Sequence, residues 1–221
     1  MRKITRWLAS RFYRPVVTKW LSRERRYSSH GLQIDVHPQV FHPGFFFSTR
    51  LLLRYLDSLP VAGKSFLELG AGSGLIAFAA EKRGALVTAT DINPFALEYL
   101  EKNRLANHSG LRLVASDLFD ALGSEVFDII AINPPYYRKT PVTPADHAWN
   151  CGENGEYFEK LFAGLGSHVH PGSIVLMILC SGCDLEMIHQ LAEKHEFWLN
   201  CVKKHRNWLE DNYIFRVERL V

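Results

Sequence analysis

The sequence predicts an α/β protein in which helices cover both faces of a seven-stranded, mostly parallel sheet. Between residues 65 and 180, short apolar stretches alternate with stretches of helical periodicity, which is the pattern of βαβ units. A glycine-rich loop follows the first apolar stretch, the usual place for a nucleotide-like ligand to meet a helix N-terminus. Two further apolar stretches, joined by a short polar link, come near the end of the chain, so the last strand is expected to be antiparallel.

The pattern also places the individual elements. Strands are expected at 65–69, 86–90, 111–115, 126–132, 173–180, 197–203 and 213–220. Helices are expected at about 50–56, 75–83, 93–107 and 184–195. Ser48 or Thr49 caps the first helix, Gly84 ends the second, and Asn93-Pro94 opens the third.

Length and composition indicate one catalytic domain with a short extension. The chain has 221 residues, 47% of them hydrophobic and 22% charged, which is enough for one sizeable core. We expect a basic aromatic arm at residues 1–30 and a catalytic domain at 31–221. No apolar run approaches the roughly 18 residues that span a bilayer. The N-terminus also lacks the features of a secretory signal, so a cytoplasmic protein is expected.

Cysteine and histidine usage favours neither a disulfide scaffold nor a metal site. The four cysteines are few and scattered, so reduced thiols are expected. The run Cys180-Ser181-Gly182-Cys183 has the spacing of a redox pair or of half a zinc site. We favour the ordinary interpretation, in which Cys180 ends a buried strand and Cys183 begins a helix. The ten histidines form no set at metal-ligand spacing, and no metal is expected.

The expected arm is strongly basic. Residues 1–30 contain nine Lys or Arg and one acid, Glu24, a net charge of +8, whereas the other 191 residues carry −5. Aromatic side chains such as Trp7, Phe12 and Trp20 are interleaved with these charges. The arm can dock on the catalytic domain, hold a nucleic-acid backbone or lie on an anionic membrane surface. Docking combined with nucleic-acid contact ranks first, and the membrane ranks last.

The glycine-rich loop runs Phe66-Leu67-Glu68-Leu69-Gly70-Ala71-Gly72-Ser73-Gly74. Its three glycines allow the close backbone approach and the positive φ angles that a ligand-binding turn needs. The spacing is not the dinucleotide fingerprint, because that pattern places its third glycine where this chain has Leu75. An NAD-dependent oxidoreductase is therefore disfavoured.

Two acids and a second motif complete the pattern. Glu68 precedes the loop and Asp91 ends the next apolar run, so both lie at carboxyl ends of parallel strands, where one can meet an ammonium group and the other a ribose diol. Residues 133–136 read Asn-Pro-Pro-Tyr. With both motifs at this separation, roughly residues 40–221 resemble the S-adenosylmethionine-dependent methyltransferases of the seven-stranded Rossmann-like type. Within them the chain is most similar to the Asn-Pro-Pro-Tyr amino-methyltransferases, which include release-factor glutamine methylases and nucleic-acid adenine-N6 or guanine-N2 methylases.

The resemblance implies S-adenosylmethionine as the cofactor. It assigns to cofactor binding one set of residues: Thr49, Glu68, Gly70, Gly72, Gly74, Asp91, Asp117 and Asn133. Asp117, just after the third strand, is expected to accept from the adenine amino group, and Thr49, with Phe47, to face the methionine end.

Ordinary interpretations of the same residues stay open. Glu68 is then a partly buried strand-end acid, Asp91 a helix-leading residue and Asp117 a turn cap. Thr49 is then part of a hydrophobic cluster with a capped helix. Asp91 is the firmest assignment, because the acid-x-Asn-Pro sequence matches the family.

Asn133, Pro134 and Tyr136 are the expected catalytic residues. A nitrogen conjugated to a ring or a carbonyl is a poor nucleophile because its lone pair is delocalised. The side-chain oxygen of Asn133 and the carbonyl of Pro134 can accept both N–H bonds and so restore the lone pair. The two prolines fix these acceptors beforehand, and Tyr136 is expected to stack on the planar group. An ordinary strand-exit turn is the alternative.

The methyl acceptor is the least constrained feature. The leading hypothesis is an N-methyltransferase that acts on a planar amino group of a macromolecule, with an RNA base slightly favoured because of the basic arm. Protein glutamine is close behind, because residues 152–158 resemble a stretch of the release-factor methylases. A catalytically silent nucleotide-binding protein of the same fold is a further alternative. The loop at 137–153 is expected to form the substrate entrance.

Overall fold

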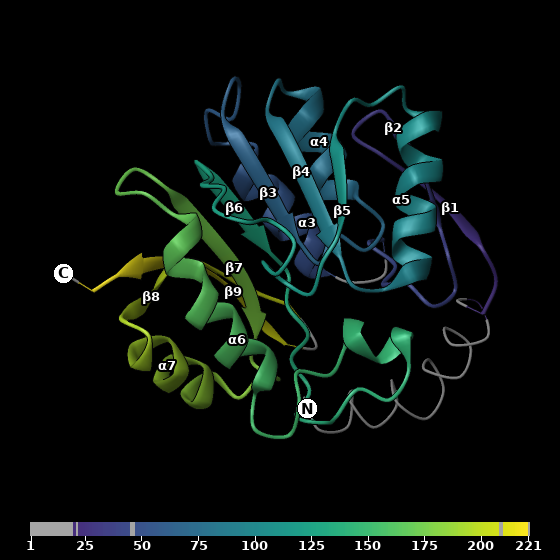
Figure 1. Ribbon diagram of the computed structural model, residues 1–221. Coiled ribbons are helices and arrows are strands. Elements are labelled where there is room, and N and C mark those ends of the chain that lie inside the picture. The colour runs from purple at the N-terminus through teal and green to yellow at the C-terminus, as the bar shows by residue number, and fades with distance from the viewer. Residues whose placement is uncertain (1–19, 21, 45–46, 208–209, 221) are drawn as a thin grey trace.

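The computed structural model describes residues 20, 22–44, 47–207 and 210–220. In this part of the chain a seven-stranded sheet forms the centre and helices cover both of its faces (Figure 1). The predicted fold class is confirmed. Most of the arm expected at 1–30, including Trp7 and Phe12, lies outside the described residues.

The strands of the large sheet lie in the order β5-β4-β3-β6-β7-β9-β8. Their bounds are β3 (Ser65–Leu69), β4 (Leu86–Asp91), β5 (Arg112–Ala115), β6 (Ile129–Ile132), β7 (Ile174–Cys180), β8 (Phe197–Arg206) and β9 (Asp211–Arg219). β9 is antiparallel to both of its neighbours, and the other neighbouring pairs are parallel. The chain moves outward from β3 to β5 and then returns to the other side of β3 as β6. The winding therefore reverses between β3 and β6, where open α/β sheets bind their ligands.

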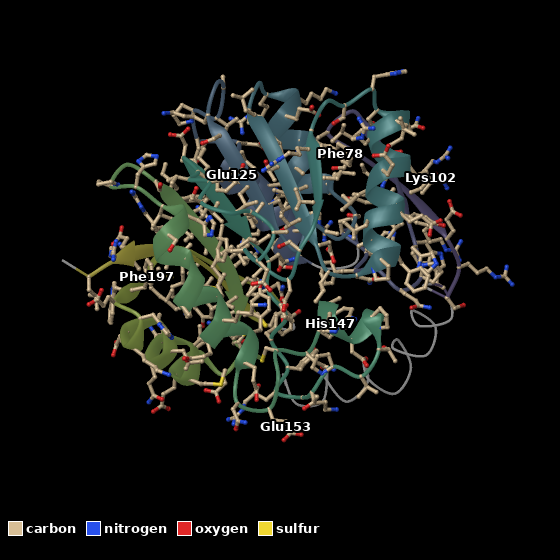
Figure 2. The ribbon with its side chains drawn as sticks, in the orientation of Figure 1. Phe78, Lys102, Glu125, His147, Glu153 and Phe197 are labelled. Carbon is tan, nitrogen blue, oxygen red and sulfur yellow. The ribbon has the colours of Figure 1, made fainter. Side chains whose placement is uncertain are left out.

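The helices divide between the two faces of the sheet. α3 (Phe47–Leu56), α4 (Leu75–Lys82) and α5 (Pro94–Ala106) pack on one face, and α6 (Glu156–Leu165) and α7 (Leu185–Lys194) on the other. Each face has its own hydrophobic core: Phe78 of α4 belongs to the first and Phe197 of β8 to the second (Figure 2). Two short 3-10 helices, η2 (Pro144–Ala148) and η3 (Gly166–His168), lie on either side of α6 in the chain.

A two-stranded hairpin precedes the large sheet and was not predicted. It consists of β1 (Arg25–Ser29) and β2 (Leu32–Val36), joined by His30 and Gly31. Both turn residues have positive φ angles, 54° and 68°, as a tight two-residue hairpin turn requires. The buried side chains of β2 join the core formed with α4 and α5. The described residues before Gly31 are thus docked on the rest of the chain.

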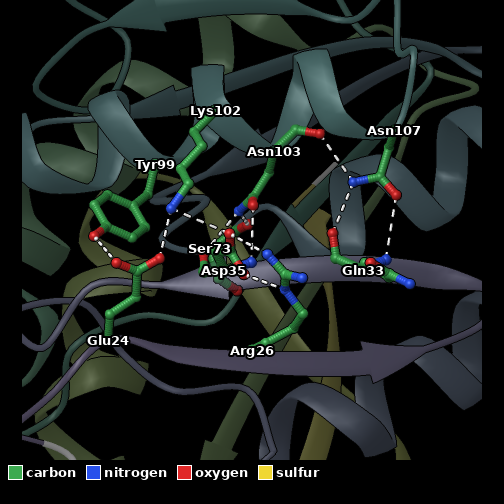
Figure 3. A network of polar contacts seen from close by, with 9 residues as sticks. All are labelled: Glu24, Arg26, Gln33, Asp35, Ser73, Tyr99, Lys102, Asn103 and Asn107. Atoms are coloured by element: carbon green, nitrogen blue, oxygen red, sulfur yellow. Dashed lines mark hydrogen bonds and ion pairs between the residues drawn. The ribbon is translucent and has the colours of Figure 1, made fainter.

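Asn103 of α5 ties this hairpin to the glycine-rich loop (Figure 3). Its Oδ1 accepts from the N–H of Asp35 at 2.8 Å, and its Nδ2 donates to the Asp35 carbonyl at 2.9 Å. The same Nδ2 lies 3.3 Å from the carbonyl oxygen of Ser73, inside the glycine-rich loop. Because Asn103 is only 1% exposed, these bonds are shielded from water and hold the two segments together.

Charged side chains add to this hairpin contact. The carboxylate of Asp35 pairs with Arg26 of the same hairpin at 2.7 Å and with Lys102 of α5 at 3.1 Å. Lys102 also pairs with Glu24, which in turn accepts from the Tyr99 hydroxyl at 3.0 Å. The bonds to Arg26 and Lys102 lower the pKa of Asp35, so it stays ionised in the neutral range.

Some boundaries differ from those expected. β8 continues to Arg206 and β9 begins at Asp211, so the link is much shorter than the expected 204–212. β8 lies at the edge of the sheet, and its exposed polar side chains and a bulge at Cys201–Lys203 hide the strand pattern. β6 begins at Ile129 and not at Val126, because Val126 is exposed and Phe127 donates its N–H to His168 outside the ladder. α6 was not among the expected helices.

The cysteine pair lies at the boundary between a strand and a helix, as expected. Cys180 is the last residue of β7, and Cys183 lies just before α7, whose N-cap is Asp184. Both are free thiols, with their sulfurs 3.8 Å apart. None of the described helices combines the length and apolar character that crossing a bilayer requires.

Candidate active site

A cavity of about 310 Å³ opens at the carboxyl ends of β3, β4 and β6, where the winding of the sheet reverses. Nine of the predicted site residues line it: Thr49, Glu68, Gly70, Gly72, Asp91, Asp117, Asn133, Pro134 and Tyr136. These residues come from segments spread over much of the chain, and the fold brings them together. Gly74 does not line the cavity, and neither does Phe47, whose ring stacks on that of His205 with the ring centroids 4.5 Å apart.

The glycines of the loop have two different roles. Gly70 and Gly72 line the cavity with φ angles of 69° and 55°, and a Cβ on Gly70 would meet nothing within 4 Å. Gly74, with φ 82°, faces the protein interior, where a Cβ would come within 2.5 Å of Phe78 and Leu100. The first two leave room for a ligand, and the third lets the loop pack closely on the helices behind it.

Glu68 supports the helix that follows the loop. Its Oε2 accepts from the N–H of Ala77, in the first turn of α4, at 2.7 Å. This N–H is one of the four at a helix start that have no partner within the helix. Burial raises the pKa of Glu68 well above its ordinary value, and the nearby charge of Asp91 raises it further. Glu68 is therefore both a structural cap and a polar group on the cavity wall.

Asp91 joins the glycine-rich loop to the start of α5. Its Oδ2 accepts from the N–H of Gly72 at 2.7 Å, and its Oδ1 from the N–H of Asn93 at 2.8 Å. Asn93 in turn caps α5 by accepting from the N–H of Phe95 at 3.0 Å. Burial raises the pKa of Asp91, although the two N–H bonds oppose this effect. The carboxylate is held in one orientation before any ligand arrives.

Asp117 lies at the rim of the cavity in an ion pair. Lys160 of α6 places its Nζ 2.5 Å from Asp117 Oδ2 and 2.7 Å from Asp120 Oδ2. Partial burial lowers the pKa of Lys160, but the bonds to the two carboxylates outweigh burial and leave the pKa raised. Lys160 is therefore positively charged in the neutral range.

Asn133 is oriented by α3. Its Nδ2 donates to the hydroxyl of Thr49 at 3.4 Å, which turns the amide nitrogen toward the helix. Within the described part of the chain, nothing donates to Asn133 Oδ1 or to the carbonyl of Pro134. Both residues line the cavity, so a pair of acceptors is left for a ligand.

The rest of the Asn-Pro-Pro-Tyr loop is fixed by the segment that follows it. The N–H groups of Tyr136 and Tyr137 both donate to the carbonyl of Trp149, at 3.0 and 2.8 Å. The N–H of Cys151 returns a bond to the carbonyl of Tyr137 at 2.9 Å. Burial raises the pKa of Tyr136, so its hydroxyl stays protonated at neutral pH. The loop at 137–153 thus braces the Asn-Pro-Pro-Tyr side of the cavity.

Several lining residues were not predicted. Tyr157 and Lys160 reach the cavity from α6, Phe41 from a loop and His147 from η2. His147 is labelled in Figure 2. The ring centroids of Phe41 and Trp149 lie 5.2 Å apart. The apolar spacing of 158, 161, 162 and 165 could have revealed α6, whereas nothing in the sequence distinguishes His147 from the other histidines.

The cavity fits S-adenosylmethionine. Its volume is that of a small-molecule site, the bare backbone at Gly70 gives room for close approach, and Asp91 is preoriented near a helix start. When bound, this cofactor supplies an electrophilic methyl group. Among the described residues, no three His, Cys, Asp or Glu side chains are arranged to hold a metal ion.

The known proteins that this chain resembles are methyltransferases. A family model for the methyltransferase small domain matches residues 31–150. A Methanocaldococcus jannaschii protein named as a candidate protein N5-glutamine methyltransferase is 31% identical over 157 residues, which cover 68% of this chain and 77% of that one. The tRNA1(Val) (adenine(37)-N6)-methyltransferase of a Flavobacteriaceae bacterium is 36% identical over 112 residues, covering 49% of this chain and 47% of that one.

A solved structure extends the likeness to the fold. The 16S rRNA N2 G1207 methyltransferase of T. thermophilus, in complex with AdoMet and guanosine, superposes with a TM-score of 0.66 at 21% identity. The match covers 89% of this chain and 50% of that one, so this chain spans about half the length of the two RNA-modifying relatives. The chain belongs to the methyltransferase small domain family and is an S-adenosylmethionine-dependent methyltransferase.

Proposed function

We propose that this protein methylates the side-chain amide nitrogen of a glutamine in a protein. The observation that carries the proposal is the pair of unused acceptors, Asn133 Oδ1 and the Pro134 carbonyl, on the wall of the cavity. A primary amide has two N–H bonds to offer such a pair. The relative named for glutamine methylation is matched over 77% of its length, which favours this acceptor.

Within this proposal the chain's residues act on the acceptor nitrogen. The two acceptors take its N–H bonds and favour a pyramidal nitrogen whose lone pair points at the methyl group. Thr49 holds the Asn133 amide in the required orientation, and the prolines at 134 and 135 keep the carbonyl in place. Tyr136, which stays neutral, packs against the planar group. Preorganised polar groups of this kind typically contribute about 3 kcal/mol each to lowering a barrier.

An amino group of an RNA base is the second candidate. It has the same planar NH₂ chemistry, and the second relative is named for tRNA adenine methylation. The basic arm favours it, but part of the arm's charge is used within the chain. Arg26 pairs with Asp35 at 2.7 Å, and the Arg25 guanidinium lies 4.1 Å from the centre of the Trp20 ring. These contacts support docking of the arm on the rest of the chain, and for this reason we rank RNA second.

The proposed site of action is the cytoplasm. Cys151, Cys180 and Cys183 are free and buried, which suits a reducing compartment.

The substrate is tested by labelled methyl transfer. Cells lacking the gene supply unmethylated protein and RNA, and the purified chain is added with methyl-labelled S-adenosylmethionine. We expect label in protein, recovered as N5-methylglutamine after complete enzymatic digestion, and none with Asn133→Ala. Label recovered only in a methylated RNA nucleoside would contradict glutamine and establish the second candidate. No transfer to either class would contradict both.

A further inference from the structure

The turn after β5 is held in a strained conformation at the edge of the cavity. Leu118 has a φ angle of 54°, which is unfavourable for a residue with a branched side chain. The Ser116 hydroxyl stabilises the turn by donating to the Leu118 carbonyl at 2.9 Å and accepting from the N–H of Ala121 at 3.0 Å. Leu118 is buried in the cavity wall, and Asp117 is left at the rim. Strain of this kind persists where a site needs a particular geometry.

Lys160 fixes the carboxylate that this turn presents. It lies one helical turn after Tyr157 on α6, so both side chains reach the cavity from the same helix face. Its Nζ contacts Oδ2 of Asp117 and Oδ2 of Asp120, and it is itself part of the cavity wall. Asp117 Oδ1 has no partner among the residues that the structure describes. One oxygen is therefore held, and the other is available as an acceptor.

Stability alone does not account for this arrangement. The side chains of Lys160 and Asp117 are 40% and 46% exposed, and ion pairs of such exposure contribute little to folding. Without the ammonium group, the carboxylates of Asp117 and Asp120 would repel each other, and Asp117 would be free to turn into solvent. The bridge therefore acts on the position of Asp117.

We propose that Lys160 is a cofactor-positioning residue, which holds Asp117 so that Oδ1 accepts from the exocyclic amino group of the adenine. The bridge leaves one net negative charge on the three side chains, which suits an N–H donor. This role concerns the cofactor side of the cavity and does not depend on whether the methyl acceptor is glutamine or RNA.

Calorimetric titration of the full chain with two product analogues tests the role. S-adenosylhomocysteine carries the adenine amino group, and S-inosylhomocysteine has a carbonyl in its place. The wild type should bind the first about tenfold more tightly, because a hydrogen bond to a charged acceptor is lost with the second. Lys160→Met should weaken the binding of S-adenosylhomocysteine about three- to tenfold and change the binding of S-inosylhomocysteine little, so the preference should fall. Lys160→Arg should keep most of the wild-type preference.

Two controls separate positioning from a general effect on folding. Lys194→Met removes another lysine that pairs with α6, at 2.7 Å from Glu159, but does not line the cavity, and it should leave both affinities unchanged. In an Asp117→Ala background, Lys160→Met should have no further effect on the preference, since the two residues act as one unit.

Several results would overturn the inference. One is a preference for S-adenosylhomocysteine that Lys160→Met leaves unchanged, and another is equal weakening of the binding of both analogues by Lys160→Met. A third is that Lys160→Met and Asp117→Ala have additive effects on the preference. If the wild type binds neither analogue, the cofactor assignment fails as well, whereas normal binding with an unchanged preference rejects the role of Lys160 alone. Thermal unfolding of each variant confirms that it is folded during the titration.

Discussion

The two sides of the cavity are built differently. On the side that we propose for the cofactor, Glu68 and Asp91 already accept backbone N–H groups, from Ala77 and Gly72 respectively. On the side that we propose for the methyl acceptor, only the side-chain nitrogen of Asn133 is engaged, and its Oδ1 has no partner within the described residues. The carboxylates of Glu68 and Asp91 thus help to build the loops, whereas the Asn133 oxygen does not.

This difference separates stability from function. Where one carboxylate both fixes a loop and binds a ligand, its removal damages folding and binding together. Where the scaffold is made by prolines and backbone bonds, as around Asn133, the reactive side chain can be changed without loss of the fold. We therefore expect substitutions on the acceptor side to affect turnover alone.

The largest expected effect follows from Asn133→Ala. The rate of methyl transfer should fall by a factor on the order of 10² to 10³, because a preorganised polar group at the reacting nitrogen is lost. The dissociation constant for S-adenosylmethionine and the melting temperature should stay close to wild type. Single-turnover transfer, calorimetry and thermal unfolding measure the three quantities. A large loss of cofactor affinity would show that the two sides are not separable.

Asp91→Ala should change two properties at once. Cofactor affinity should fall about 10- to 100-fold, since bonds to a charged group are each worth about 1.5 to 3 kcal/mol. The free energy of unfolding should also fall by about 1 to 3 kcal/mol, because buried N–H groups lose their acceptor. Asp128→Ala is a matched control: Asp128 accepts from the Ser65 N–H at 2.9 Å and does not line the cavity. Asp128→Ala should lower stability and leave cofactor binding intact. If Asp91→Ala binds the cofactor as tightly as the wild type does, Asp91 has only a structural role.

Two glycine substitutions sharpen the contrast within one loop. Gly74→Ala forces a Cβ within 2.5 Å of Phe78 and Leu100 and should cost about 1 to 3 kcal/mol of stability. Gly70→Ala meets no neighbour within 4 Å, so it should cost only about 1 to 2 kcal/mol through its φ angle of 69°. Its methyl group enters the cavity, however, and should weaken cofactor binding more than Gly74→Ala does. Denaturant unfolding and calorimetry on both variants test this, and the reverse order of affinities would contradict the assignment.

The smallest effect concerns pH. Burial raises the pKa of Glu68 in the folded chain above its value in the unfolded chain, so folding favours the neutral carboxyl group. Its stabilising contribution is complete below the unfolded pKa of about 4.3 and is lost as the pH rises through the folded pKa. The glutamine in Glu68→Gln stays neutral and can still accept from the N–H of Ala77. Without cofactor, the melting temperature of this variant relative to that of the wild type should therefore rise as the pH is raised from about 5 to about 8. A difference that does not change with pH would argue against a raised pKa.

Local patterns made much of this molecule predictable. The strand, glycine turn and helix around Gly70, and the cap formed by Asn93 and Pro94, are specified by residues adjacent in the chain. Parallel strands then bring their carboxyl ends to one edge, so predicted residues from Thr49 to Tyr136 line one cavity. The position of each acid at or near the carboxyl end of its strand was sufficient to place it there.

Contacts between distant segments were not predictable in this way. Lys160 and Asp117 are 43 positions apart, and the pattern of α6 indicates which face is buried but not what the other face meets. The hairpin was missed because β1 reads Arg-Arg-Tyr-Ser-Ser, which has no apolar alternation, and its arginines were interpreted only as charge. Gly74 was assigned to the cofactor together with Gly70 and Gly72 as part of one glycine-rich motif, and only the packing shows that its Cβ position faces inward.

The shared bonds of Asn103 have a consequence for local opening of the protein. Because this side chain joins Asp35 of the hairpin to Ser73 of the glycine-rich loop, neither segment can detach without exposing the buried polar atoms of the other. The hairpin and the loop should therefore exchange their amide hydrogens as one cooperative unit. A ligand seated on the loop, although it contacts no residue of β1, should slow deuterium uptake throughout Arg25–Val36.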